Sequence, residues 1–159
     1  MSFSRPLTGS KRLHDADALC VRIAAMDLLS RREHSQNELL FKLQNKGADA
    51  HIARQVVDRL AEQNLQSDLR FAEMLVNSCV FKGRGPLRLQ QDMEQHGIQP
   101  SLFEPVLEEH QVDWQALAQR VYEKKYGDSA VDGYNERAKR MRFLQGRGFS
   151  TSQITSVVR

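Results

Sequence analysis

The sequence predicts an all-α protein, built as an elongated, curved array of three tandem three-helix repeats. Glycine and proline are few in its 159 residues, strand-like alternation is scarce, and 40% hydrophobic residues suffice for a core. Helical segments ending at Gly47, Gly97 and Gly148 also recur at intervals of 50 and 51 residues. A three-helix unit of this size is marginal alone, so neighbouring units should stack. The expected boundaries are 1–15 for a flexible basic tail and 16–65, 66–112 and 113–159 for the repeats.

Each repeat begins with an amphipathic helix, in which apolar residues recur three or four positions apart. The expected buried faces are Leu19, Ile23, Met26 and Leu29, then Phe71, Leu75 and Val80, then Trp114, Leu117, Val121 and Tyr122. Cys20 and Cys79 fall within these patterns, so we expect two buried, reduced thiols. A longer connection, about 126–134, follows in the third repeat, because its Gly and Asp residues suit a surface loop.

The second helix of each repeat follows a sharp corner. Ser35 and Glu38 have the spacing of a capping box, in which each side chain bonds the other's backbone N–H, and Gly47 supplies a left-handed stop. Gly85 and Pro86 begin the equivalent helix differently, since Pro suits the first helical position. The side chains expected to face the core are Leu39, Leu40 and Leu43, then Leu89 and Met93, then Met141 and Leu144.

The third helices follow the repeated glycines. Asp49, Ser101 and Ser150 are expected to cap them, because a short side chain with an oxygen accepts a bond from the first turn. Pro100 and Pro105 must both lie at or before the first turn of the second of these helices. We therefore expect that helix to start late or to bend.

The net charge of +3 is unevenly distributed. Residues 1–88 carry 14 Lys and Arg against 10 Asp and Glu, and residues 120–159 carry nine against four. Between them, residues 89–119 carry six Asp and Glu and no Lys or Arg. This alternation favours a partner that presents both signs of charge, such as a protein–nucleic acid assembly. An ordinary solvated helical surface is the alternative.

Basic side chains gather at the corners of the repeats. Arg31 and Arg32 close a helix, where the helix dipole alone favours a cation. Recurrence at equivalent corners favours a binding face instead. The residues expected to contact a partner or DNA are Arg31, Arg32, Lys42, Lys46, Lys82, Arg84, Arg88, Lys124, Lys125, Arg137, Lys139, Arg140, Arg142 and Arg147.

Catalytic, metal-binding and membrane signals are not found in the sequence. It has no phosphate-binding glycine loop, no dinucleotide-binding motif and no nucleophile elbow, and its five histidines are scattered. We therefore expect no enzyme activity, no metal and no cofactor. No apolar run approaches the ~20 residues that span a bilayer, and no export signal is evident, so we expect a cytoplasmic protein without membrane contact. It should be a monomer, because no heptad seam stands out.

Four stretches resemble the RecX family of recombination regulators. They are LLSRREHSQNELLFKLQNKG at 28–47, GRGPLRLQQDMEQHGI at 83–98, EKKYG at 123–127 and RAKRMRFLQGRGFSTSQITSVV at 137–158. The resemblance covers roughly residues 16–159. It implies the same array of three-helix units and a regulator of DNA repair, homologous recombination and the SOS response. Such a protein binds RecA and its filament on single-stranded DNA, and inhibits filament extension and thereby RecA's ATPase, strand exchange and coprotease activities.

The alternative is a sequence-nonspecific DNA-binding protein built of helix-turn-helix-like repeats. Weak direct contact with DNA is compatible with either reading. Against a pure DNA-binding role, the acidic segment 89–119 would repel phosphate. Its nearest candidate base readers, Gln90, Gln91 and Gln95, also stand among acidic residues.

Overall fold

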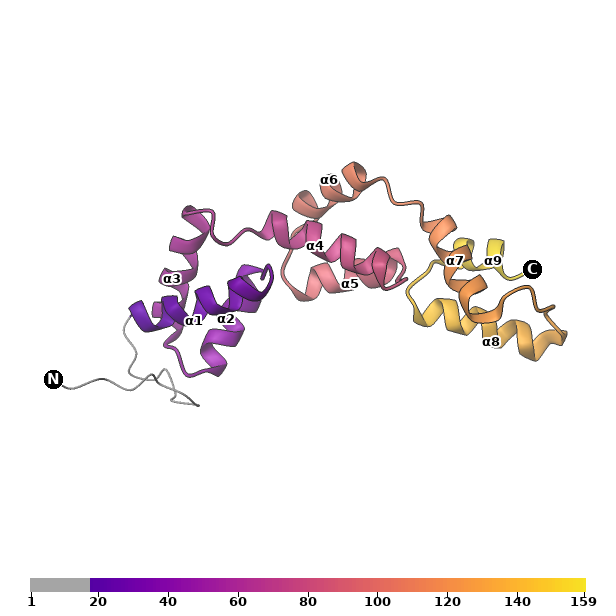
Figure 1. Cartoon of the computed structure of the whole chain (residues 1–159), viewed down its shortest axis with the longest axis horizontal. Helices are drawn as coiled ribbons and strands as arrows, with labels where there is room; N and C mark the ends of the chain where they lie inside the picture. Colours follow the sequence, from indigo (N-terminus) through magenta and orange to yellow (C-terminus); the bar gives the residue numbers. More distant parts are fainter. Residues whose placement is uncertain (1–17) are drawn as a thin grey trace. The chain divides into compact units, whose positions relative to one another are not determined.

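The computed structural model describes residues 18–159, which form nine α-helices and no strand (Figure 1). The helices are α1 Ala18–Arg31, α2 Gln36–Asn45, α3 Ala50–Glu62, α4 Asp68–Phe81, α5 Pro86–Gln95, α6 Pro100–His110, α7 Trp114–Tyr126, α8 Gly133–Gly146 and α9 Thr151–Val157. The predicted all-α class is confirmed. The predicted basic tail, 1–15, lies outside the described residues. Contacts divide the chain into a first unit, through Phe71, and a second unit, Ala72–Arg159, which are described separately.

The core of the first unit lies between α1, α2 and α3. Val21, Ala25 and Leu28 of α1 are buried against Leu39 and Leu43 of α2 and an apolar face of α3. The face predicted for α1 is therefore partly wrong. Leu19 and Ile23 are 63% and 61% exposed, while Met26 and Leu29 are only partly buried. The reason is that α1 is apolar on more than one side, so spacing alone admits two faces.

The first corner confirms most of the local predictions. Ser35 is the N-cap of α2 and accepts a bond from the Glu38 N–H over 3.1 Å. The other half of the predicted capping box is replaced, because the Glu38 carboxylate pairs with Arg32 instead. Gly47 has φ +94°, the left-handed conformation expected at a helix stop. Asp49 caps α3, accepting from two backbone N–H groups.

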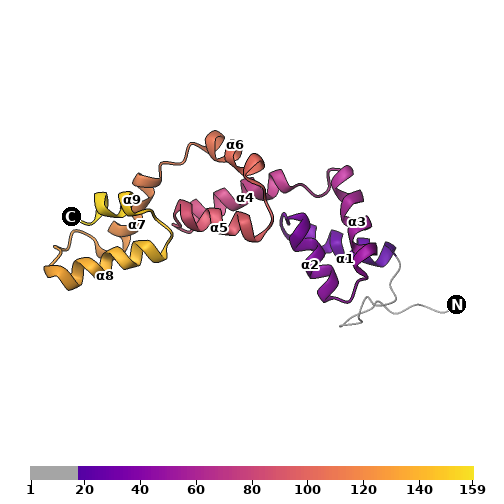
Figure 2. The same cartoon turned by 180° about the vertical axis from the view of Figure 1, so that it is seen from behind.

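In the second unit, α9 packs against α7 and α8 (Figures 1 and 2). Leu117 and Tyr122 of α7 share a buried cluster with Leu144 of α8, Phe149 and Ile154. Buried side chains also line the inner faces of α4, α5 and α6: Val76, Cys79, Leu89, Met93, Phe103 and Val106. Of the two thiols expected to be buried, Cys79 is buried and Cys20 is exposed.

Two corners of the second unit meet backbone to backbone. The Gly85 N–H donates to the Arg147 carbonyl over 2.8 Å, and the Leu87 N–H donates to the Gly148 carbonyl over 3.0 Å. A Cβ at Gly85 would lie 2.3 Å from the Gly148 carbonyl oxygen. Glycine is therefore required there by close approach, and this junction fixes the start of α5 against the end of α8.

The N-termini of α6 and α9, the third helices of the second and third repeats, are capped differently. Ser150 caps α9 as predicted, and it does so in a full capping box with Gln153. The cap predicted at Ser101 is wrong, because Gln99 precedes α6 and Pro100 takes its first position. Pro105 lies inside α6 rather than in its first turn. Because proline has no N–H, the carbonyl of Ser101 lacks its usual hydrogen-bond donor in the helix. Ser101 is exposed, so water can donate to that carbonyl instead.

Candidate partner-binding groove

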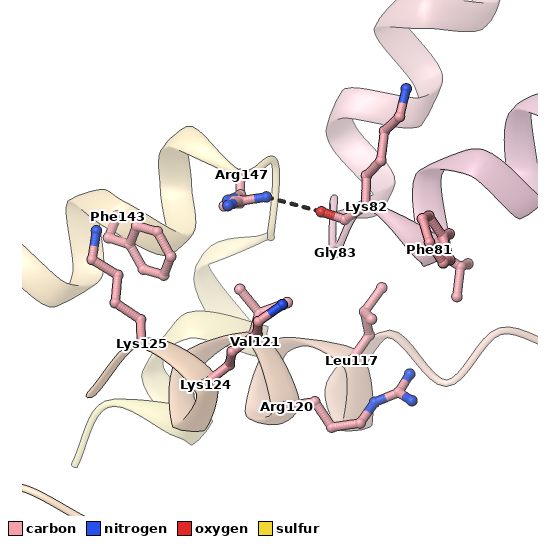
Figure 3. Close-up of a pocket in the computed structure, with 11 residues that line it drawn as sticks. Phe81, Lys82, Gly83, Leu117, Arg120, Val121, Lys124, Lys125, Phe143 and Arg147 are labelled. Carbon is pink, nitrogen blue, oxygen red and sulfur yellow. Dashed lines mark hydrogen bonds between the residues drawn. The ribbon is translucent and has the colours of Figure 1, made fainter. Parts of the chain in front are cut away.

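An open groove of about 590 Å³ lies between α4 and α7 in the second unit (Figure 3). We call it the α4–α7 groove. It is lined by Val80, Phe81, Lys82, Gly83, Leu117, Arg120, Val121, Lys124, Lys125, Phe143 and Arg147. The floor is apolar, five of the lining side chains are cationic, and none of them is acidic. Such a surface attracts a negatively charged group and offers an apolar side chain a place to bury.

Arg147 is held in place at one edge of this groove. It is the C-cap residue of α8, beside the junction of the two corners. Its Nη1 donates to the Lys82 carbonyl oxygen over 2.9 Å (Figure 3). Its guanidinium carbon also lies 5.6 Å from the centroid of the Phe143 ring. The cation is thus positioned by both helices that meet at the groove edge.

Lys125 occupies the same end of the groove. Its Nζ lies 4.1 Å from the centroid of the Phe143 ring, a cation–π contact. The Phe143 and Tyr126 rings in turn form a T-shaped pair at 86°, with centroids 5.7 Å apart. Phe143 is therefore already packed by its neighbours, and the positive charges of Lys125 and Arg147 stand over it.

A smaller hollow of about 230 Å³ adjoins the groove, and we call it the arginine hollow. It is lined by Arg84, Arg88, Gly146 and Arg147. Arg88 pairs with Asp92 over 3.4 Å, and Arg84 lies 4.0 Å from the same carboxylate. Because Arg147 lines both spaces, the groove and the hollow present one connected group of cations.

The structure brings together six of the predicted basic residues. Lys82, Lys124, Lys125 and Arg147 line the groove, and Arg84 and Arg88 line the arginine hollow. Sequence reasoning missed Arg120 and the 91% exposed Phe81. Arg120 stands one helical turn before Lys124, so the helical spacing could have placed it on the same face. No spacing rule points to Phe81, which follows the buried face of α4.

Three of the predicted basic residues of the first unit have internal partners. Arg31 pairs with Asp27 over 3.0 Å, and Arg32 and Lys42 flank the Glu38 carboxylate. Burial alone would raise the pKa of Glu38, but hydrogen bonds from Arg32 and Lys42 outweigh it and lower that pKa to about 2. Lys46 is exposed after α2.

Buried His34 completes this first corner. Its Nδ1 lies 3.0 Å from the Arg32 carbonyl oxygen, which can only accept a hydrogen bond. Its Nε2 lies 3.1 Å from the Lys42 ammonium, which can only donate one. These contacts fit a neutral imidazole with its proton on Nδ1. Burial lowers the pKa of His34, which favours the same neutral form. Gln66 donates to the His34 carbonyl over 3.1 Å. The corner is thus a structural network.

Arg140 is not a surface contact residue, and this prediction is corrected. Its side chain is only 4% exposed and donates to the Tyr122 hydroxyl over 2.7 Å and the Ser129 carbonyl over 2.9 Å. It also pairs with Glu136 over 2.9 Å and lies 4.6 Å from the Tyr126 ring centroid. Arg140 therefore fastens the α7–α8 connection. The other predicted residues of α8, namely Arg137, Lys139 and Arg142, are exposed.

Among the described residues, neither a metal-binding cluster nor an ionised Cys79 thiol is present. Within 18–159, no group of three or more His, Cys, Asp or Glu is placed to hold a metal ion. Burial raises the pKa of Cys79 to about 11, so this thiol is neutral and donates to the Arg84 carbonyl. Over the same range, every helix is too short or too polar to cross a membrane.

Three family models match the chain in order. The first three-helix domain of RecX matches residues 22–60, the second matches 67–107 and the third matches 111–158. The chain belongs to the RecX family. The predicted resemblance and the tandem arrangement of three three-helix domains are confirmed.

Relatives and solved structures agree with this assignment. The regulatory protein RecX of Halorhodospira halophila is 40% identical over 134 residues, 84% of this chain and 83% of that protein. The RecX of Pseudomonas syringae pv. tomato is 39% identical, over 86% of this chain and 88% of that protein. A crystal structure of RecX from Lactobacillus salivarius superposes with a TM-score of 0.73 at 22% identity, covering 91% of this chain and 96% of that one. This last likeness concerns the fold.

Proposed function

We propose that this RecX protein binds RecA and its filament on single-stranded DNA and inhibits filament extension. Lower RecA ATPase, strand exchange and coprotease activities follow from the shorter filaments. The observation that carries the proposal is membership of the RecX family through all three domains, whose relatives are named regulatory proteins. In this account the protein acts as a cytoplasmic monomer and catalyses no reaction of its own.

The α4–α7 groove supports a protein partner. Exposed Phe81 beside an apolar floor can bury a large area against another protein. The cations around it steer an oppositely charged surface into place and set its orientation. Both features are absent from a merely solvated helical face, whose charges alternate in sign.

Inhibition can follow from binding alone. Each RecA protomer in a growing filament must offer a free surface to the next protomer. A bound RecX protein at the growing end occupies or distorts that surface, so one copy stops the addition of many protomers. The proposal therefore requires inhibition at a RecX concentration well below that of RecA.

Direct DNA binding is the second candidate, and the arginine hollow is the observation that favours it. Three guanidinium groups, from Arg84, Arg88 and Arg147, suit a phosphate. Asp92 already pairs with two of them and reduces the positive charge on offer. We therefore assign DNA a weak, salt-sensitive contact secondary to the protein contact.

A binding comparison separates the two candidates. Single-stranded DNA is immobilised either bare or covered by a RecA filament that is locked by a slowly hydrolysed ATP analogue. The protein should bind the filament at least about tenfold more tightly than bare DNA. Equal affinity for both surfaces would support the DNA-binding alternative.

A further inference from the structure

The α4–α7 groove continues past Phe81 into a second space of about 420 Å³. Val76, Val112 and Ala116 line this space, which we call the Val112 hollow. Phe81 and Arg120 line both the groove and the hollow, so they stand where the two meet. Together the two spaces form one extended channel along α4 and α7, with an apolar floor and polar or charged side chains at its edges.

The two ends of this channel carry different charges. Lys124 and Lys125 lie in the last turn of α7, near Arg147. Asp113, the N-cap residue of α7, lines the Val112 hollow at the opposite end of that helix. Lys124 stands eleven positions after Asp113, which is about 16 Å at the rise of an α-helix. A ligand that fills the channel must therefore match a strongly positive end and an end where the Asp113 carboxylate offsets the charge of Arg120.

We propose that the channel binds an amphipathic α-helix of a protein partner, with acidic residues at the end that meets Lys124, Lys125 and Arg147. This inference rests on the proposed function, under which the helix belongs to RecA. A length of about 16 Å corresponds to three helical turns, so apolar side chains at positions i, i+3 or i+4, and i+7 reach the floor.

The direction of the bound helix follows from its charges. Acidic residues are most stabilising in the first turn of a helix, where the dipole is positive. The acidic end of the ligand is then its N-terminus, and it lies beside the C-terminal turn of α7. The ligand helix therefore runs antiparallel to α7, with its own dipole opposed to that of α7.

A single nucleic acid strand fits the channel less well. Sequence-tolerant binding of single strands needs a uniformly positive track and open aromatic faces for stacking. The floor is aliphatic, Lys125 and Arg147 already stand over the Phe143 ring, and Phe81 is the one aromatic side chain of the lining left open for stacking. At the far end Asp113 offsets the positive charge of Arg120, so the positive track does not continue there. An acidic amphipathic helix satisfies each of these features.

Photo-crosslinking from position 81 tests the proposal directly. Phe81 is replaced by p-benzoylphenylalanine, which its 91% exposure tolerates, and the full chain is irradiated on RecA filaments. Tyr134, which is 85% exposed and lines neither the groove nor the Val112 hollow, is the matched control position. The expected result is a crosslink from position 81 to one acidic, amphipathic helix of RecA. The double variant Arg120→Glu, Lys124→Glu should lower its yield at least about fivefold.

Three outcomes would overturn the proposal. These are a crosslink from position 81 to the DNA, a crosslink to a RecA segment without acidic and helically spaced apolar residues, and no crosslink although the filament is bound. Failure of the unmodified chain to bind RecA filaments is a separate result. It would refute the proposed function itself, and the assignment of the helix to RecA with it.

Discussion

Arg147 donates a hydrogen bond to the backbone carbonyl of Lys82 over 2.9 Å, across 65 positions of sequence. The bond joins the end of α8 to the end of α4, and both residues line the α4–α7 groove. The cations that the sequence placed at separate corners of two repeats thus belong to one surface. This convergence makes the groove, rather than any single corner, the unit that mutations should test.

Reversing two charges at the groove should weaken the inhibition of RecA. The double variant Lys124→Glu, Lys125→Glu places carboxylates where the account requires an acidic ligand, so inhibition should need at least about tenfold more protein. The control is Arg137→Glu, Arg142→Glu, which changes the charge equally on exposed positions of α8 outside the groove. Inhibition curves of RecA activity measure both. Equal losses in the two variants would show that only total charge matters.

The junction of the two corners should tolerate no side chain at Gly85. Its φ of −86° suits any residue, so the penalty is purely steric, from a Cβ 2.3 Å from the Gly148 carbonyl oxygen. Gly85→Ala should lower the free energy of unfolding by about 1–3 kcal/mol, as overpacking does. Gly146→Ala is the control, because a Cβ there meets nothing within 4 Å. Urea unfolding compares the two, and an unchanged midpoint for Gly85→Ala would contradict the backbone contact.

The first corner should weaken in acid through Glu38. Its pKa is about 2 in the folded protein and 4.5 ordinarily, so the folded state favours the ionised form. The stability that this carboxylate contributes is complete above pH 4.5 and is lost as the pH falls from there towards 2. Glu38→Gln should flatten the pH dependence of unfolding in that window. Denaturation curves at pH 5, 4 and 3 measure it, and parallel losses in both proteins would contradict the role of Glu38.

Arg140 should act on stability and leave the groove intact. Arg140→Gln removes the charge that binds Glu136 and the α7–α8 connection, so it should lower the melting temperature clearly more than Arg142→Gln on the exposed face. Arg140→Lys should restore only part of the loss, since an ammonium cannot reproduce the planar fork. Equal melting temperatures for the Gln variants at 140 and 142 would mean that the network contributes nothing.

Local features were predictable from the sequence because their causes lie within a few residues. Ser35, Asp49 and Ser150 cap helices that begin beside them, and Gly47, Gly97 and Gly148 have the positive φ that a helix stop requires. The equal spacing of these glycines then indicates the repeats. Each such prediction needs only one turn of chain and its flanking residues.

Features that depend on tertiary packing were not predictable. The buried face of α1, which includes Ala25, is decided by the packing of α1 against α3 and α2, and not by the spacing of Leu19 and Ile23. Arg140 lies in a basic run that is typical of a surface. Its partners Tyr122 and Ser129 stand 18 and 11 positions away, beyond any helical spacing rule. The groove likewise requires α4 and α7 to meet.

The most direct test of the central claim is RecA's ATP hydrolysis on single-stranded DNA, with this protein titrated in well below the RecA concentration. The account predicts that hydrolysis falls at these low ratios, because each bound copy stops the extension of a filament. The groove variant Lys124→Glu, Lys125→Glu should lose this effect. Hydrolysis that stays constant until the protein matches RecA or saturates the bare DNA would contradict the account.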